Sequence, residues 1–170
     1  MNARWLASTT LAGLVTLGLV TVGLVSPGLA PNAHALDFTG GGGKIGYMAA
    51  EGDNDGLALG AHVELESAGS NFHLRPNVLY WDGDDANGFT AALDGLYHFG
   101  SQSETVPYLG AGAGFTILDP SSGAESQTDP AINMFGGVQF PAGQNLMFME
   151  GRYTVSDVSQ ASLGFGVTFR

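Results

Sequence analysis

The last ten residues of the chain alternate strictly between apolar and small or polar side chains. Apolar residues occupy the odd positions from Ala161 to Phe169, whereas serine, glycine, threonine and arginine occupy the even positions that follow them. A period of two places all the apolar side chains on one face of an extended strand. The pattern therefore predicts a β-strand with one apolar and one polar face that runs to the end of the chain.

The same alternation occurs seven more times, and clusters of turn-forming residues separate the segments. We expect strands over 38–50, 56–66, 71–81, 88–100, 105–118, 131–140, 145–155 and 161–170. Pro76 lacks a backbone donor and suggests a local bulge in the third strand. The connections are too short for a crossover helix, so sequential strands should be antiparallel neighbours. Eight such strands predict an all-β, up-and-down barrel, because closure removes the free edges.

The segment before the strands has a different character. An uncharged stretch follows Arg4 and contains an apolar run over 11–25, a Ser-Pro-Gly break and the small-residue site Ala33-His34-Ala35. This order is typical of a secretory signal peptide that is cleaved after the second of these alanines. The alternative is a retained membrane anchor, because the uncharged run is long enough to span a bilayer. We therefore expect a signal peptide over 1–35 and a barrel domain over 36–170.

The amino-acid composition excludes some modifications and some classes of partner. The sequence has no cysteine, which excludes disulfides and a lipid-modified cysteine at the cleavage site. Residues 36–170 contain four basic and sixteen acidic residues, a formal charge of −12. A chain this acidic is not expected to bind nucleic acid, whose phosphates require a basic surface. Charged residues make up 12% of the full sequence, about half the usual share in soluble domains.

Three observations favour a barrel with its apolar face outside, as in a membrane, over a soluble barrel with its apolar face inside. First, the polar face is largely glycine and alanine, which cover a wet surface poorly but leave room in a narrow lumen for larger side chains from opposite strands. Second, the charges on this face lie near mid-strand in equal numbers of each sign, and buried charges must be paired. We therefore predict a lumen charge network of Lys44, Glu64, Arg75, Asp94, Glu150 and Arg152.

The third observation is the position of the aromatic residues. Many lie near the ends of the apolar face, where the interfacial girdles of membrane barrels are found; they are Phe72, Tyr80, Phe89, Phe99, Phe140, Tyr153 and Phe169. Five large side chains instead fall on the polar face and should fill the lumen or its mouths; they are Trp81, Tyr108, Phe135, Leu146 and Phe148.

Candidate chemistry is sparse. The acidic turns 53–56 and 82–85 have the residue types of a calcium loop but not its length, and hairpin chemistry explains them equally well. His62, His73 and His98 alternate toward the polar face, and we interpret them as hydrogen-bonding partners in the lumen rather than metal ligands. The serines lie in turns without an adjacent histidine pattern. We expect no catalytic residue, no metal site and no cofactor.

The signal peptide, the eight alternating strands and the ending Gly164-Phe165-Gly166-Val167-Thr168-Phe169 resemble the small outer-membrane β-barrel superfamily, the OmpA- and opacity-protein-like transmembrane domain. Gly151-Arg152-Tyr153 resembles the aromatic-Arg-Tyr signature of the penultimate strand in such barrels. The chain departs from the family's C-terminal aromatic residue, because Arg170 follows Phe169. The resemblance carries over no functional residue, since these barrels share architecture more than activity.

The resemblance implies a monomer in a Gram-negative outer membrane, in contact with lipid and lipopolysaccharide and inserted by the barrel-assembly machinery. It also implies periplasmic termini, so that the connections 51–55, 82–87, 119–130 and 156–159 lie outside and hold ten of the sixteen acids. The first hypothesis for function is a non-enzymatic structural or surface-interaction role, with the lumen plugged by its charged pairs. The alternatives are a narrow porin-like channel gated by these pairs and a soluble periplasmic lipocalin-like carrier.

Overall fold

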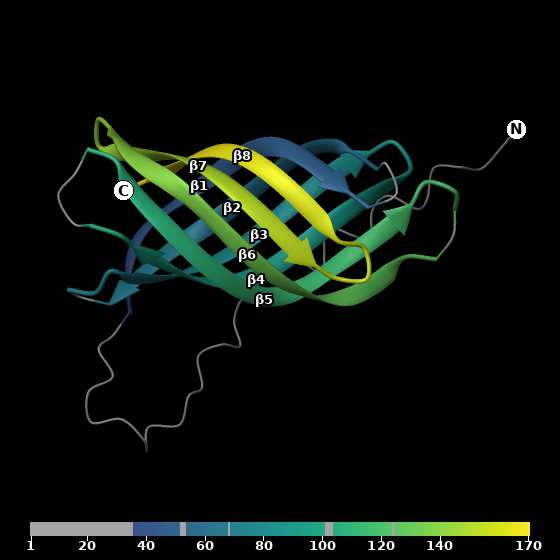
Figure 1. Ribbon diagram of the computed structural model, residues 1–170, viewed down its shortest axis with the longest axis horizontal. Coiled ribbons are helices and arrows are strands. Elements are labelled where there is room, and N and C mark those ends of the chain that lie inside the picture. The colour runs from purple at the N-terminus through teal and green to yellow at the C-terminus, as the bar shows by residue number, and fades with distance from the viewer. Residues whose placement is uncertain (1–35, 52–53, 68, 101–103, 124) are drawn as a thin grey trace, which may run out of the picture. The chain divides into compact units, whose positions relative to one another are not determined.

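The computed structural model describes residues 36–51, 54–67, 69–100, 104–123 and 125–170, and these form eight strands that close into a barrel (Figure 1). The strands are β1 (Leu36–Ala50), β2 (Gly56–Ser67), β3 (Phe72–Gly83), β4 (Ala86–His98), β5 (Val106–Pro120), β6 (Gln127–Ala142), β7 (Asn145–Val155) and β8 (Gln160–Phe169). Every strand pairs antiparallel with its sequence neighbours. The prediction of an all-β, up-and-down, eight-stranded barrel is confirmed. The segment 1–35, interpreted as a signal peptide, lies outside the described residues.

β8, the strand with the strict alternation, closes the barrel against β1. Their ladder runs from Gly41 opposite Phe169 to Ala50 opposite Gln160. Closure pairs both strands on both sides, so neither presents a free edge. The β1–β2, β3–β4, β5–β6 and β7–β8 connections lie at one end of the barrel, here called the loop end, and the other three connections lie at the opposite turn end. Gly143, in the connection between β6 and β7, has a φ of 69°, a left-handed conformation that favours glycine.

The predicted bulge at Pro76 is wrong. The β2–β3 ladder is interrupted between His62 opposite Asn77 and Leu65 opposite Leu74, but the register is the same on both sides of the interruption. The missing proline donor therefore leaves a gap in the ladder without an inserted residue. The register shift of the barrel instead lies in β1, between Phe38 and Gly40.

The longest predicted connection is shorter than expected. Residues 127–130, assigned to the connection 119–130, extend β6 and pair with residues 115–118 of β5. Likewise β3 reaches Gly83 and β4 begins at Ala86, which shortens the predicted connection 82–87. Polar composition indicated loops at these places, but backbone hydrogen bonds continue the ladder whether or not the side chains are apolar.

The two faces of the barrel wall have opposite polarity. Large apolar side chains are exposed on the outer face along every strand, for example Leu59 and Leu163, of which 58% and 62% are exposed. Several aromatic residues near the strand ends belong to this outer face, including Phe72, which lies opposite Tyr97, and Tyr80, which lies opposite Phe89. The described residues that are buried include seventeen polar or charged ones and eleven apolar ones. The core of this barrel is therefore mainly polar, the reverse of a soluble domain.

Glycines on the inner face make room for large inward rings. A Cβ atom on Gly166 would lie 2.7 Å from Phe148 Cε1 and 2.6 Å from the carbonyl oxygen of Gly43, both too close. The ring that uses the space belongs to the directly paired residue on the adjacent strand, not to an opposite strand as the sequence suggested. The same pairing occurs at Gly88–Trp81, Gly110–Phe135 and Gly137–Tyr108. Of the five large side chains predicted to point inward, these four are buried, and Leu146 is half-buried.

Candidate functional site

The structure brings the six charged residues predicted for the lumen together near the middle of the barrel. They lie on β1, β2, β3, β4 and β7, and the alternation along each strand points their side chains inward. Glu150 and Arg152 are two residues apart on the inner face of β7, and Arg75 lies opposite Asp94 in the β3–β4 ladder. The remaining two members are Lys44 on β1 and Glu64 on β2.

Glu150 is the centre of this network. Its Oε1 atom accepts hydrogen bonds from Lys44 Nζ at 2.9 Å and from Arg152 Nη2 at 3.0 Å. Its Oε2 atom accepts hydrogen bonds from Arg75 Nη1 at 2.9 Å and from the Tyr108 hydroxyl at 3.1 Å. Three cations and a hydroxyl thus surround one carboxylate that is 2% exposed. Without such partners a buried charge would strongly destabilise the fold.

Arg75 connects this centre to the turn end of the lumen. Its Nη2 and Nε atoms donate to Glu64 Oε1 at 2.5 and 3.2 Å. Its guanidinium lies over the rings of Tyr108 and Phe148, 5.3 and 5.4 Å from their centroids. The planar guanidinium can therefore serve two carboxylates and two aromatic faces at once, which an ammonium group could not do.

Asp94 is the second acceptor of the network. Its Oδ2 atom accepts hydrogen bonds from Arg152 Nη2 at 2.6 Å and from Asn77 Nδ2 at 2.8 Å. Asn133 Nδ2 donates to Oδ1 at 3.3 Å, and the Thr154 hydroxyl donates to Asn133 Oδ1 at 2.9 Å. The hydrogen bonds therefore extend from β3 and β4 across the lumen to β6 and β7.

Apolar clusters lie on both sides of the charges. Toward the loop end are Met48, Ala50, Ala58, Leu79 and Trp81. Toward the turn end are Leu96, Tyr108, Phe135 and Phe148. The six charged side chains are between 0% and 10% exposed. Charge interactions here act in a medium of low dielectric constant, so they are stronger, and costlier to break, than on a surface.

The three predicted inward histidines lie in the lumen near the turn end. His62 Nε2 is 2.9 Å from the Thr168 hydroxyl, which agrees with the predicted role as a hydrogen-bonding partner. The rings of His73 and His98 meet edge to face with centroids 4.3 Å apart. His73 Nε2 lies 4.0 Å from Glu66 Oε2. This distance is longer than the 2.9 Å between His62 and Thr168, so His73 is held less tightly by its polar neighbour.

Four members of the network were not predicted as site residues. Tyr108 was expected only to fill space, and Asn77, Asn133 and Thr154 were not assigned a partner. The signal that identifies them is the same for all four, since each is a polar side chain at an inward position of its strand's alternation. Buried side-chain polar groups require partners, so these positions could have been added to the six charges.

Among the residues that the structure describes, no group of three or more His, Cys, Asp or Glu side chains is arranged to hold a metal ion. The calcium-like turns contribute no such group within that part of the chain. None of the described residues forms a helix that is long and apolar enough to cross a membrane.

A closed eight-stranded barrel with an apolar exterior and a polar, side-chain-filled lumen is the architecture of the small outer-membrane barrels. Neisserial surface protein A has this fold with a TM-score of 0.66 and 16% identity, over 79% of the present chain and 98% of its own. The N-terminal β-barrel domain of Pseudomonas aeruginosa OprF gives a TM-score of 0.54 and 18% identity, over 78% and 100% of the two chains. The outer membrane enzyme PagL gives 0.52 and 14%, over 75% and 98%. At these identities the likeness concerns the fold.

Sequence comparisons add little. The family profile described as "GLTT repeat (6 copies)" matches residues 12–32, inside the segment interpreted as a signal peptide. A comparison with curated proteins finds no match.

Proposed function

We propose that this protein spans the outer membrane of a bacterium as a plugged barrel, with a structural or surface-interaction role and no catalytic activity. The observation that carries the proposal is the polarity of the wall, which is apolar outside and mainly polar inside. A soluble carrier would expose these apolar side chains to water, whereas lipid covers them without cost. The solved structures with this fold include outer-membrane proteins, which supports the same location.

The strands have the length that this location requires. A tilted strand crosses the hydrocarbon core with about 9–11 residues. The shortest strand, β8, has 10 residues and the longest, β6, has 16. Every strand is therefore long enough to cross the membrane, and β5 and β6 continue beyond their neighbours at the loop end, where residues 127–130 pair with residues 115–118.

The plug rests on the packing of the lumen. An eight-stranded barrel is just wide enough for side chains to fill. Here three cations and three carboxylates pair across the lumen, and aromatic or aliphatic clusters lie above and below them. Such a lumen favours rigidity over diffusion. Replacing any member without its partner leaves an uncompensated buried charge.

We propose the orientation and partners that the barrel type implies. A signal peptide over 1–35 is removed, both ends of the barrel domain lie in the periplasm, and the loop end faces outward. Lipid and lipopolysaccharide surround the wall, the barrel-assembly machinery inserts it, and the barrel acts as a monomer because closure leaves no strand edge for a second copy. No nucleic acid and no cofactor take part.

The fold alone does not exclude catalysis, because PagL, which has a similar fold, is an outer membrane enzyme. The proposed absence of catalysis rests instead on how little the polar side chains of the lumen are exposed to a substrate. The His62–Thr168 pair places a hydroxyl beside an imidazole. Both residues are buried, with 6% and 0% exposed. The Thr168 hydroxyl is therefore not exposed to solvent, which supports a role in lumen packing rather than in catalysis.

The first test is fractionation. We expect the protein in the membrane fraction, resistant to urea extraction, and running at different apparent sizes on gels before and after heating. Release into the soluble fraction without detergent would support the lipocalin-like carrier instead. The second test is conductance in planar bilayers, where the plug predicts no steady channels. Channels whose conductance changes in Glu150→Gln would support the porin-like alternative.

A further inference from the structure

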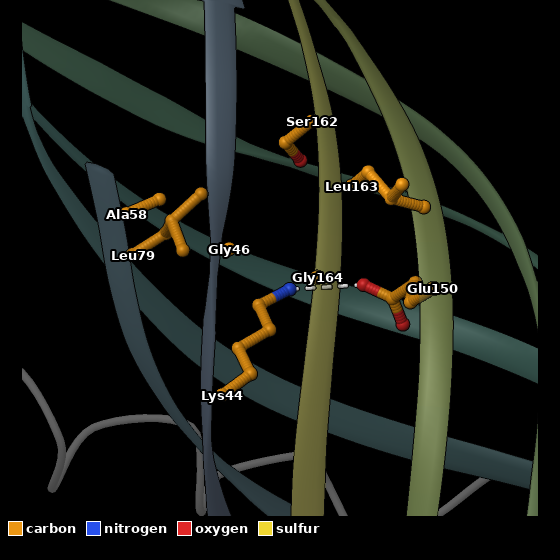
Figure 2. A pocket seen from close by; sticks show the side chains of 8 residues that line it. All are labelled: Lys44, Gly46, Ala58, Leu79, Glu150, Ser162, Leu163 and Gly164. Atoms are coloured by element: carbon orange, nitrogen blue, oxygen red, sulfur yellow. Dashed lines mark hydrogen bonds and ion pairs between the residues drawn. The ribbon is translucent and has the colours of Figure 1, made fainter. Parts of the chain in front are cut away.

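A small cavity lies beside the charged network, on the side of the barrel where β8 closes against β1. Its volume is about 10 Å³, close to the space that one water molecule needs. Figure 2 shows Lys44 extending past Gly164 to Glu150, with Ser162 further along the same strand. The lining residues are Lys44, Gly46, Ala58, Leu79, Glu150, Ser162, Leu163 and Gly164.

The polar groups that line this cavity have unused hydrogen-bonding capacity. An ammonium group has three donors, and the structure gives Lys44 Nζ one acceptor, Glu150 Oε1. The Ser162 hydroxyl, which can both donate and accept, has no side-chain hydrogen bond in the described part of the chain. The side chain of Lys44 is 10% exposed although it lies in the middle of the lumen, whereas the side chain of Glu150 is 1% exposed. The cavity therefore adjoins an ammonium group that still has donors to offer.

The charges around the cavity decide what can occupy it. A cation in the cavity would lie beside the Lys44 ammonium, and an anion would lie beside the Glu150 carboxylate. The six charges of the network already balance, three against three. A small neutral molecule that both accepts and donates hydrogen bonds fits, because it adds no net charge. We propose that the cavity is a binding site for one structural water, which accepts from Lys44 Nζ and bonds the Ser162 hydroxyl.

Gly164 offers a way to displace this water without moving the backbone. A Cβ atom at this position would lie 3.4 Å from the carbonyl oxygen of Ile45 and 3.9 Å from Lys44 Cδ, both ordinary contacts. Gly46 is unsuitable, because its Cβ atom would lie 2.9 Å from the Cα atom of Gly164. Gly151 supplies the control, because it is exposed on the outer face and its Cβ atom would meet nothing closer than a carbonyl oxygen at 4.0 Å.

The experiment measures the unfolding of the refolded protein in detergent micelles by urea. Replacing a strand glycine by alanine favours folding when nothing is displaced, so G151A should raise the unfolding midpoint. G164A should lower it, with a folding equilibrium constant about tenfold below that of the unsubstituted protein, because the ammonium and the hydroxyl lose their shared partner. A dry cavity predicts the opposite, since the added methyl would fill apolar space and G164A would stabilise at least as much as G151A. That result would overturn the proposal.

A double-mutant cycle separates lost water from steric strain. In K44M the principal donor to the water is absent while two arginines still compensate Glu150, so G164A should no longer destabilise in that background. An equal loss in both backgrounds would mean that the methyl clashes, and the proposal would fail. A crystal structure of the unsubstituted barrel checks it directly. An ordered water within hydrogen-bonding distance of Lys44 Nζ and Ser162 Oγ is expected, and empty density there would refute it.

Discussion

Removing the charge of Glu150 is the sharpest test of how the lumen is held together. Glu150→Gln keeps the size and shape of the side chain, so it opens no cavity and moves no backbone. It leaves three cations facing two carboxylates inside the barrel, because Lys44, Arg75 and Arg152 all contact this residue. The amide nitrogen of glutamine is a donor and would also face donors on one side of the site.

The expected loss in the free energy of unfolding follows from the burial of Glu150 and its three cations. Breaking a buried ion pair by removing one partner costs about 3–5 kcal/mol, mostly because the remaining charge is uncompensated. Glu150 is 2% exposed, and none of its three cations is more than 10% exposed, so solvent can screen little of the imbalance. We therefore expect Glu150→Gln to lower the free energy of unfolding by about 3–5 kcal/mol.

Urea unfolding of the refolded barrel in micelles, followed by the heat-dependent gel shift, measures this loss. Glu104→Gln is the matched control, because it makes the same change at an exposed position between β4 and β5. Its effect should stay within about 0.5 kcal/mol. If Glu150→Gln behaved like this control, the network would not be what holds the lumen together.

A compensating double variant keeps the test informative if Glu150→Gln alone fails to fold. Lys44→Met combined with Glu150→Gln restores a balance of two cations and two carboxylates. Residues in one ion-pair network couple strongly in double-mutant cycles, so the double variant should be more stable than Glu150→Gln alone. Two losses that merely add would contradict a mutual network.

Three further predictions concern the wall and the lumen. Gly110→Ala should cost about 1–3 kcal/mol in urea unfolding, because its Cβ atom would lie 2.6 Å from the carbonyl oxygen of Gly95 and would contact the Phe135 ring; Gly151→Ala should not. Ile45→Arg on the outer face, 54% exposed, should cost about 2–4 kcal/mol in lipid vesicles, and a lack of effect would argue against lipid contact. Trp81 is 0% exposed, so acrylamide should quench the fluorescence of the barrel domain weakly; strong quenching would indicate a water-filled lumen.

The strands and the inward charges follow from the period of two, but the partners of each charge do not. Arg75 lies opposite Asp94 in the β3–β4 ladder, yet Asp94 accepts from Arg152 across the lumen and Arg75 reaches Glu150. Such contacts depend on the tilt and register of all eight strands at once. The register itself includes a shift near Thr39 that no residue type announces.

Errors at the strand ends have a different origin. Residues 127–130 are polar, which suggested a loop, but the ladder between β5 and β6 continues through them. The side-chain pattern indicates which face of a strand contacts lipid. The hydrogen-bond ladder depends on the backbone instead, and it continues beyond the residues with apolar outer side chains. Sequence patterning therefore predicts the membrane-facing part of such strands better than their full length.

The separation of charge in the barrel bears on what can approach it. The lumen network is balanced, so the net charge resides at the two ends. Nine described acids lie in or beside the connections of the loop end, whereas Asp37, Glu66 and Glu104 share the turn end with Arg170. Fields from surface charges extend about 8–10 Å at physiological salt. The loop end therefore attracts positively charged partners, while the buried pairs, which salt screens less than surface charges, hold the wall beneath it together.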